Sequence, residues 1–373
     1  MESSEGRVGA AVRAPELAAL VEGTGPFASV YLTTVADVEN AAQRSMQHWK
    51  TVRSELELAG APADVLDAVE QQVPDAHLEG SSLGVIAGPG TLHVEHHVVP
   101  PPADVGRWGP VPAVLPLVRW RQSTPPVVVV LTDRTGADLT AIRRDRPPVA
   151  REAAGADFPL TKVHAGGWSS RRYDQRVENT WEQNAANVAA EVTRLAQQVR
   201  ARLVVAAGDE RALALLTREL DAPVTDRFRI LEGGRAAGAD GIDDEALVSA
   251  VAEAVDADTD AVLAVFEEER GQDDRAVEGV TPTVDALARA AVDVLLVSDD
   301  VDDDRTAWVG PNATALATGA DDLRGLGVHE PVEGPLVDAL LRAALATSAG
   351  VRVVPADRAP KDGVGAILRW SYS

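Results

Sequence analysis

The sequence predicts an α/β protein of three domains. Its 373 residues exceed what one hydrophobic core usually serves. Short apolar runs typical of buried strands alternate with longer segments whose apolar residues recur every three or four positions, as on one helix face. The chain separates into segments at residues 1–122, 123–226 and 227–373, each expected to fold as one α/β domain.

The first segment predicts a strand, a helix and a hairpin. Residues 27–32 form an apolar run, and residues 40–58 carry apolar side chains at helical spacing. Residues 83–99 predict a hairpin, because two apolar runs flank the turn Gly88-Pro89-Gly90. The proline-rich stretch 100–116 is expected to wrap or link without regular structure.

The hairpin also holds the best candidate for a metal site. His93, Glu95 and His97 alternate along a strand, so they can share a face and offer nitrogen and oxygen ligands to zinc. No fourth ligand is in view, and an ordinary exposed strand face is the preferred interpretation. The chain has no cysteine and no phosphate loop, nucleophile elbow or dinucleotide fingerprint. We therefore expect no metal, no cofactor and a protein that binds rather than catalyses.

The second segment predicts a mixed sheet with helices packed on it. Residues 127–131 and 137–142 form strands around the turn 133–136, and a strand at 203–206 and a helix at 212–220 follow. Asp133 and Asp138 are interpreted as turn residues, because the acidic cluster of a nuclease is not evident. A long amphipathic helix lies between these elements, with an apolar face formed by Tyr173, Val177, Trp181, Val188, Val192, Leu195 and Val199.

The third segment predicts a three-layer α/β/α domain. The expected helices cover residues 244–255, 259–270, 284–291 and 335–347. The expected strands cover residues 292–297, 351–354 and 362–369. Alternation of helices with apolar strands is typical of a sheet that is covered on both faces.

A basic, glycine-hinged loop precedes the long helix and is the candidate binding site. Two adjacent glycines let the backbone turn sharply or approach a partner closely, and Ser169 or Ser170 can cap the helix. The aromatic and basic side chains then stand at the positively polarised helix N-terminus, a geometry suited to phosphate oxygens. The candidate RNA-binding residues are Lys162, His164, Gly166, Gly167, Trp168, Ser169, Ser170, Arg171, Arg172 and Arg176.

The distribution of charge favours this assignment despite a net charge of −23. Residues 143–176 carry eight basic side chains against four acidic ones, whereas residues 240–304 carry many acidic side chains and three arginines. A locally basic region suits contact with nucleic acid phosphates. The acidic region suits solvent or a basic protein surface.

The loop resembles the central-domain loop of archaeal and eukaryotic class-1 peptide release factors. There a Gly-Gly-Gln tip enters the peptidyl transferase centre, and here Trp168 takes the place of the glutamine. An indole has one N–H donor and no amide carbonyl, so it cannot position a hydrolytic water as a glutamine does. The resemblance carries over the loop's shape and basic flank but not the catalytic residue. The first segment lacks the Asn-Ile-Lys-Ser motif that release factors use around the stop codon.

The resemblance covers the second segment and, in outline, the third, and it implies a ribonuclease-H-like middle domain. The bacterial branch of the superfamily is similar in the Gly-Gly-Trp-Ser loop, the Arg-Arg-Tyr step at 171–173 and the Gly-Val-Gly-Ala segment at 363–366. This branch includes Balon-type ribosome hibernation factors of actinobacteria. The resemblance thus implies a factor that contacts rRNA in the ribosomal A site and silences translation in dormancy or stress, and it leaves delivery by elongation factor Tu open.

Two alternatives remain open. One is a codon-independent peptidyl-tRNA hydrolase in ribosome rescue, with Ser169, His164 or a backbone N–H positioning water. The other is a stress-associated scaffold whose acidic third domain binds protein. A cytoplasmic location is expected in each case, without membrane or DNA as a partner, because no signal peptide or membrane-spanning run is visible.

Overall fold

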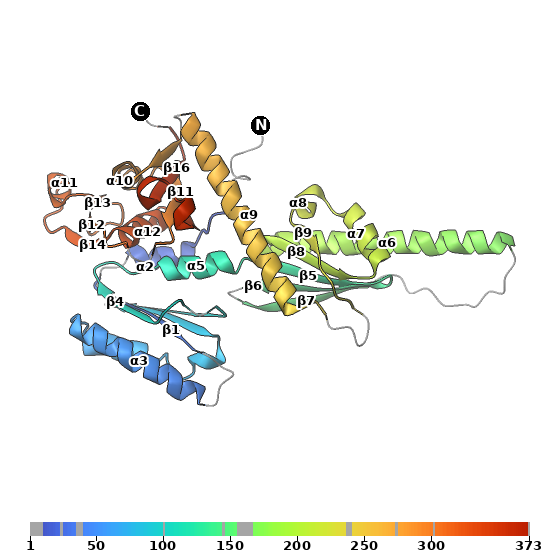
Figure 1. The fold of residues 1–373 in the computed structure, drawn as a ribbon, viewed down its shortest axis with the longest axis horizontal. Helices are drawn as coiled ribbons and strands as arrows, with labels where there is room; N and C mark the ends of the chain where they lie inside the picture. The colour runs from blue at the N-terminus through green and yellow to red at the C-terminus, as the bar shows by residue number, and fades with distance from the viewer. Residues whose placement is uncertain are drawn as a thin grey trace. The chain divides into compact units, whose positions relative to one another are not determined.

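The computed structural model describes residues 10–22, 25–34, 40–99, 101–143, 146–154, 167–235, 241–272, 275–300 and 303–371 (Figure 1). For residues 146, 147, 154 and 167–180 it describes the backbone only. The chain divides into two compact units, one formed by residues 1–122 and 258–373 and the other by residues 123–257. Each unit is described here by itself.

The N-terminal part of the first unit contains an antiparallel sheet in the order β3-β2-β1-β4. Its helices and strands are η1 (Pro15–Leu17), α2 (Ala18–Glu22), β1 (Phe27–Thr33), α3 (Ala41–Leu58), α4 (Ala63–Glu70), η2 (Ala76–Leu78), β2 (Ser82–Gly88), β3 (Thr91–His97), β4 (Val105–Gly109) and α5 (Leu115–Ser123). The apolar faces of α3 and α4 pack against alternate residues of β1 and β2, as in Trp49 and Leu66 against Val30 and Val85. The predicted strand, helix and hairpin are confirmed.

Two expectations for this part are wrong. The proline-rich stretch contains strand β4, which pairs with β1 at the edge of the sheet. Proline near the ends of an edge strand removes no hydrogen bond from the ladder. Within β4, Gly106 allows close approach to α3, because a Cβ atom there would collide with Val52.

The face of β3 with the two histidines is also less exposed than expected. The His97 side chain is buried and stacks on Trp120 of α5, with ring centroids 5.2 Å apart and an interplanar angle of 13°. Glu95 accepts hydrogen bonds from His93 at 2.8 Å and from Arg121. The strand face is therefore an internal contact with α5, which periodicity on one strand does not reveal.

The C-terminal part of the first unit has a mixed sheet in the order β10-β16-β11-β15 and a small antiparallel sheet in the order β13-β12-β14. Its elements are β10 (Ala276–Glu278), α10 (Val280–Ala288), β11 (Val292–Ser298), β12 (Thr306–Val309), β13 (Leu316–Ala317), α11 (Ala320–Gly325), β14 (Val332–Pro335), α12 (Leu336–Ala346), β15 (Gly350–Val354), η3 (Ala356–Arg358), η4 (Lys361–Gly363) and β16 (Val364–Leu368).

Helices cover both faces of the four-stranded sheet in this part. Along β11, Leu295 and Val297 face the core that contains α10 and α12, whereas Val294 and Leu296 face Val262 and Phe266 of α9 (Asp244–Gly271). Successive strand residues point to opposite faces, so an apolar run is required where both faces are covered. The predicted three-layer α/β/α arrangement is confirmed, although the small sheet around β12 was not predicted.

The second unit has a five-stranded sheet in the order β7-β6-β5-β8-β9, in which β5, β8 and β9 run parallel. Its elements are β5 (Val127–Thr132), β6 (Gly136–Arg143), β7 (Arg146–Ala154), α6 (Gly167–Val199), β8 (Leu203–Gly208), α7 (Glu210–Glu219), α8 (Ala222–Thr225), β9 (Phe228–Ile230) and the first part of α9. Helices α6 and α7 pack on one face through Val128 and Val204, and α9 packs on the other through Val127 and Val205.

Helix α9 runs without a break from Asp244 to Gly271, where two helices were predicted. The residues between the predicted helices, Asp256-Ala257-Asp258, contain neither glycine nor proline, so nothing in them breaks a helix. Strand β7 was also missed, because Pro147 and Pro148 mask its strand pattern.

The α/β fold class is confirmed by these sheets and their helical layers. The division into three domains at residues 122 and 226 remains a prediction. Within the described ranges, no helix is long and apolar enough to span a membrane.

Candidate nucleic-acid interface

The predicted binding residues fall on and before the N-terminal end of α6. Helix α6 begins at Gly167, and its N-terminal part extends beyond the sheet of its unit (Figure 1). Lys162, His164 and Gly166 lie outside the described residues. The other seven belong to the first three turns of the helix, where only the backbone is described: Gly167, Trp168, Ser169, Ser170, Arg171, Arg172 and Arg176.

The helix therefore begins earlier than expected. Ser169 and Ser170 lie inside its first turn rather than before it, so neither occupies the predicted cap position. Serine is compatible with the first turn, because its hydroxyl can accept a hydrogen bond from one of the first four backbone N–H groups, which have no acceptor within the helix. These unpaired N–H groups and the helix dipole give the tip of α6 a partial positive charge.

The C-terminal part of α6 is fixed to the sheet by apolar contacts. Val188, Val192, Leu195 and Val199 are buried against β5, β6 and β8, at the spacing that the sequence predicted. Each buried aliphatic side chain contributes about 1.5–3 kcal/mol relative to exposure. This part of the helix is a stable base for the part that extends beyond the sheet.

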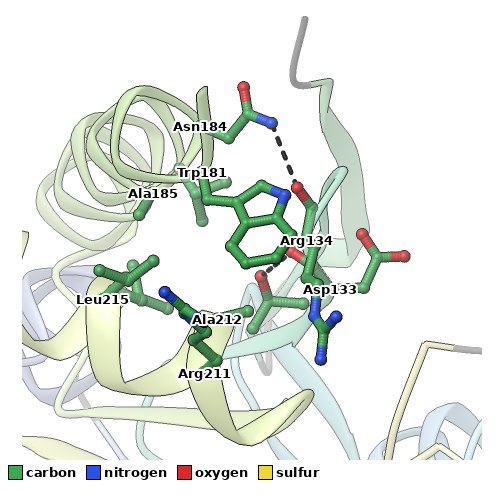
Figure 2. A pocket seen from close by; sticks show the side chains of 11 residues that line it. Asp133, Arg134, Trp181, Asn184, Ala185, Arg211, Ala212 and Leu215 are labelled. Atoms are coloured by element: carbon green, nitrogen blue, oxygen red, sulfur yellow. Dashed lines mark hydrogen bonds between the residues drawn. The ribbon is translucent and has the colours of Figure 1, made fainter. Parts of the chain in front are cut away.

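A cluster around Trp181 lies where α6 meets the ends of β5 and β8 (Figure 2). The guanidinium carbons of Arg134 and Arg211 lie 5.0 and 4.9 Å from the centroid of the Trp181 ring. Asn184, one turn further along α6, donates a hydrogen bond of 3.2 Å from its side-chain amide to the backbone oxygen of Arg134. Three elements thus meet at one indole: the β5–β6 turn, α6 and the start of α7.

Asp209 holds both arginine-bearing elements in place. Its carboxylate binds the Arg134 guanidinium at 2.9 Å and accepts hydrogen bonds of 3.1 Å from the backbone N–H groups of Arg211 and Ala212, capping α7. The hydrogen bond from Arg134 is the main influence that lowers the Asp209 pKa, so the carboxylate stays ionised at neutral pH. The preceding Gly208 has φ +146°, and a Cβ there would collide with the backbone of Thr132.

A second charged cluster lies on the same sheet around Arg235. Its guanidinium binds Asp138 at 2.9 Å, Glu152 at 3.1 Å and Asp133 at 3.3 Å. Burial opposes ionisation of Asp133, but hydrogen bonds from Thr135 and Gly136 and the charge of Arg235 outweigh it and lower the Asp133 pKa. Asp133 is a turn residue, as predicted, whereas Asp138 is a strand residue of β6.

The carboxylates of Asp133, Asp138 and Glu152 all form ion pairs with the Arg235 guanidinium. Across the residues that the structure describes, no group of three or more histidine, aspartate or glutamate side chains has the geometry to hold a metal ion. What the region offers chemically is a helix N-terminus that can accept anions, with Arg134 and Arg211 held further along the helix at Trp181.

Sequence reasoning identified Trp181 only as part of an apolar helix face and missed the roles of Arg134, Asp209 and Arg211. The start signal of α7 was visible, since an aspartate before a helix is a preferred cap. The contact between Arg134 and Trp181 was not visible in the sequence, because 47 positions separate the two residues.

Comparison with known proteins gives a family match for the middle of the chain. Residues 126–272 match the model of bacterial archaeo-eukaryotic release factor family 2. The uncharacterized protein Rv2629 of Mycobacterium tuberculosis strain H37Rv, and MT2704 of strain CDC 1551, are each 30% identical to this chain over 227 residues. Each alignment spans 60% of this chain and 60% of the relative. The family match supports the resemblance of the middle segment to the release-factor superfamily.

Several solved structures are similar to this chain at low identity. An archaeal translation termination factor, aRF1, is 15% identical, with 96% of this chain and 99% of that chain covered and a TM-score of 0.27. Dom34 of S. cerevisiae is 9% identical, with 78% and 87% covered and a TM-score of 0.38. Archaeoglobus fulgidus Pelota is 13% identical, with 78% and 80% covered and a TM-score of 0.33.

Proposed function

We propose that this protein is a ribosome-associated translation factor that occupies the A site and silences translation in dormancy or stress without releasing peptide. The proposal rests on one observation: the segment that matches a release-factor family contains the Gly-Gly loop and the start of α6, with Trp168 where release factors have glutamine. The partner is the ribosome, contacted through rRNA. Elongation factor Tu is the proposed delivery partner, and the proposed location is the cytoplasm.

The residue types at the loop support binding without hydrolysis. The Trp168 indole can stack on a nucleobase but has no amide carbonyl to orient an attacking water. Arg171, Arg172 and Arg176 follow in the first three turns of α6, close to the positive end of the helix dipole. Guanidinium groups make bidentate contacts with phosphate, so this end of α6 suits the phosphate backbone of rRNA.

The test is cosedimentation of the purified protein with vacant 70S ribosomes. The triple variant Trp168→Ala, Arg171→Ala, Arg172→Ala is compared with wild type and with a matched control, Trp370→Ala, Arg324→Ala, Arg358→Ala. The control removes an exposed tryptophan and two exposed arginines from the other unit. We expect the loop variant to lose binding and the control to bind as wild type does. Each lost phosphate contact should reduce the slope of log affinity against log salt by about one.

Peptide release separates silencing from rescue. Ribosomes carrying peptidyl-tRNA should retain their peptide when the wild-type protein binds. Release that is abolished in a Gly166→Ala, Gly167→Ala variant would replace the silencing proposal with a peptidyl-tRNA hydrolase. Absence of ribosome binding by wild type, with and without elongation factor Tu, would overturn both functions.

A further inference from the structure

Helix α6 has two parts that are held differently. From Val188 onward its apolar face is buried against the sheet, whereas its N-terminal part extends beyond the sheet (Figure 1). Trp181 lies between these parts, at the end of the sheet where β5 stops at Thr132 and β8 stops at Gly208. We call residues 167–180 the α6 arm.

The contacts of Trp181 join the helix at this point to two other elements of the unit. Arg134 reaches the ring from the β5–β6 turn, and Arg211 reaches it from the first turn of α7 (Figure 2). Neither arginine is free to swing with α6, because Asp209 binds the Arg134 guanidinium and caps the helix that carries Arg211. The Asn184 amide adds a hydrogen bond to the backbone of the same turn. The ring is thus held by groups that belong to the body of the unit.

The position of the last fixed point determines how far the tip of the arm can move. Thirteen residues separate Trp168 from Trp181, or about 20 Å of helix, whereas sixteen residues separate it from the buried, hydrogen-bonded Asn184, or about 24 Å. Deflection of a rod held at one end increases steeply with its free length. Holding α6 at Trp181 therefore shortens the free length of the arm by about one turn relative to a helix held from Asn184 onward, and so restricts the tip.

From this geometry we infer that Trp181, clamped between Arg134 and Arg211, is a positioning residue that sets the direction of the α6 arm. The arm carries Trp168, Arg171 and Arg172, so its direction determines whether these side chains can reach RNA together. The inference rests on the proposed function for the nature of the partner. The role of Trp181 is orientation and not contact with RNA, since its ring already faces two guanidinium groups of its own unit.

The test uses spin labels in the 373-residue chain, which has no cysteine to remove. One label is placed on the arm as Gln175→Cys and one on the body as Ala222→Cys, the exposed first residue of α8. The distribution of distances between the labels is measured in wild type, Trp181→Leu and Trp181→Phe. Leucine keeps an apolar side chain but removes the π face that attracts a guanidinium, whereas phenylalanine retains it.

We expect a narrow distribution in wild type and Trp181→Phe and a broad one in Trp181→Leu. The double variant Arg134→Met, Arg211→Met should broaden it equally with the tryptophan in place. Affinity for 70S ribosomes should fall about two- to thirtyfold in Trp181→Leu and remain unchanged in Trp181→Phe. Circular dichroism of each variant establishes that the helices are intact, so that a broad distribution reports the arm and not unfolding.

The outcomes separate this inference from the proposed function. A narrow distribution in both clamp-breaking variants overturns the inference, even if wild type binds ribosomes. A broad distribution with unchanged ribosome affinity overturns the claim that arm direction matters for binding. If wild type fails to bind ribosomes, the proposed function fails, whereas the distance measurement still supports or rejects the clamp.

Discussion

The two units of this protein place their charged side chains in opposite ways. In the unit formed by residues 1–122 and 258–373, Arg121, Asp338, Arg342 and Arg352 are buried. In the unit formed by residues 123–257, the described residues include no buried charged side chain, and the buried polar ones are Thr132 and Asn184. Buried charged side chains thus have a structural role in the first unit, whereas the described charged side chains of the second unit stay at least partly exposed to solvent.

The buried charges of the first unit join segments that are far apart in sequence. Arg342 donates hydrogen bonds of 3.0 Å to the backbone oxygens of Val21, Gly310 and Pro311. Arg107 of β4 binds Asp338 of α12 at 2.6 Å. A buried charge that lacks its partner is costly, so such contacts specify which segments come together. In the second unit, Arg134 and Arg211 lie against the Trp181 indole, and Arg235 lies against carboxylates that are 38–68% exposed.

The largest effect is expected for Arg342→Leu. The change leaves several buried carbonyl oxygens without a donor, and we expect the free energy of unfolding of this unit to fall by about 3 kcal/mol or more. Urea denaturation of the variant and of Arg358→Leu, at an exposed arginine of the same unit, measures the difference. A loss below about 1 kcal/mol would show that water replaces the guanidinium and that burial of this charge is not structural.

The next effect is a pH dependence of stability that Asp338→Asn should remove from the first unit. Burial raises the pKa of Asp338 from 3.8 to about 6, against the lowering effect of Arg107. Between these two values the folded protein holds a proton that the unfolded chain has released, so this group makes stability fall as pH rises. The total fall is about 3 kcal/mol, at 1.36 kcal/mol per pKa unit.

Asparagine cannot ionise, so relative to wild type the variant should gain about 2.5 kcal/mol of stability between pH 4 and pH 7.5, since a small part of the total fall lies below pH 4. Urea denaturation at both pH values measures this change, with Asp357→Asn at an exposed carboxylate as the control. An equal difference at the two pH values would contradict the assignment of the raised pKa to Asp338.

The smallest effect is expected for Arg235→Gln in the second unit. Its three carboxylate partners are exposed to solvent by 38–68%, so water screens each ion pair. We expect a loss of about 1 kcal/mol, which high salt should diminish further. Hydrogen exchange of the β6 and β7 amides at low and high salt measures it. A loss comparable with that of Arg342→Leu, and insensitive to salt, would remove the contrast between the units.

The local elements followed from the sequence wherever one short stretch carries the signal. The apolar spacing from Val188 to Val199 located the docked part of α6, and the turn at Gly88 located the β2–β3 hairpin. Strand β4 was missed because prolines surround it, and α9 was divided in two because its acidic midpoint resembles a break. Proline near an edge strand and charge within an exposed helix are both compatible with regular structure, so neither is a reliable boundary.

The candidate interface divides in the same way. The sequence by itself determined the α/β class, the loop with its Trp168 in place of glutamine, and the long helix that follows, because periodicity and residue order are local properties. Only the tertiary structure decided that Arg134 and Arg211 contact the ring of Trp181. It also decided that Arg235 forms ion pairs with three carboxylates and that His97 is buried against α5. These contacts join residues distant along the chain, and their geometry depends on how sheets and helices pack, which no local pattern encodes.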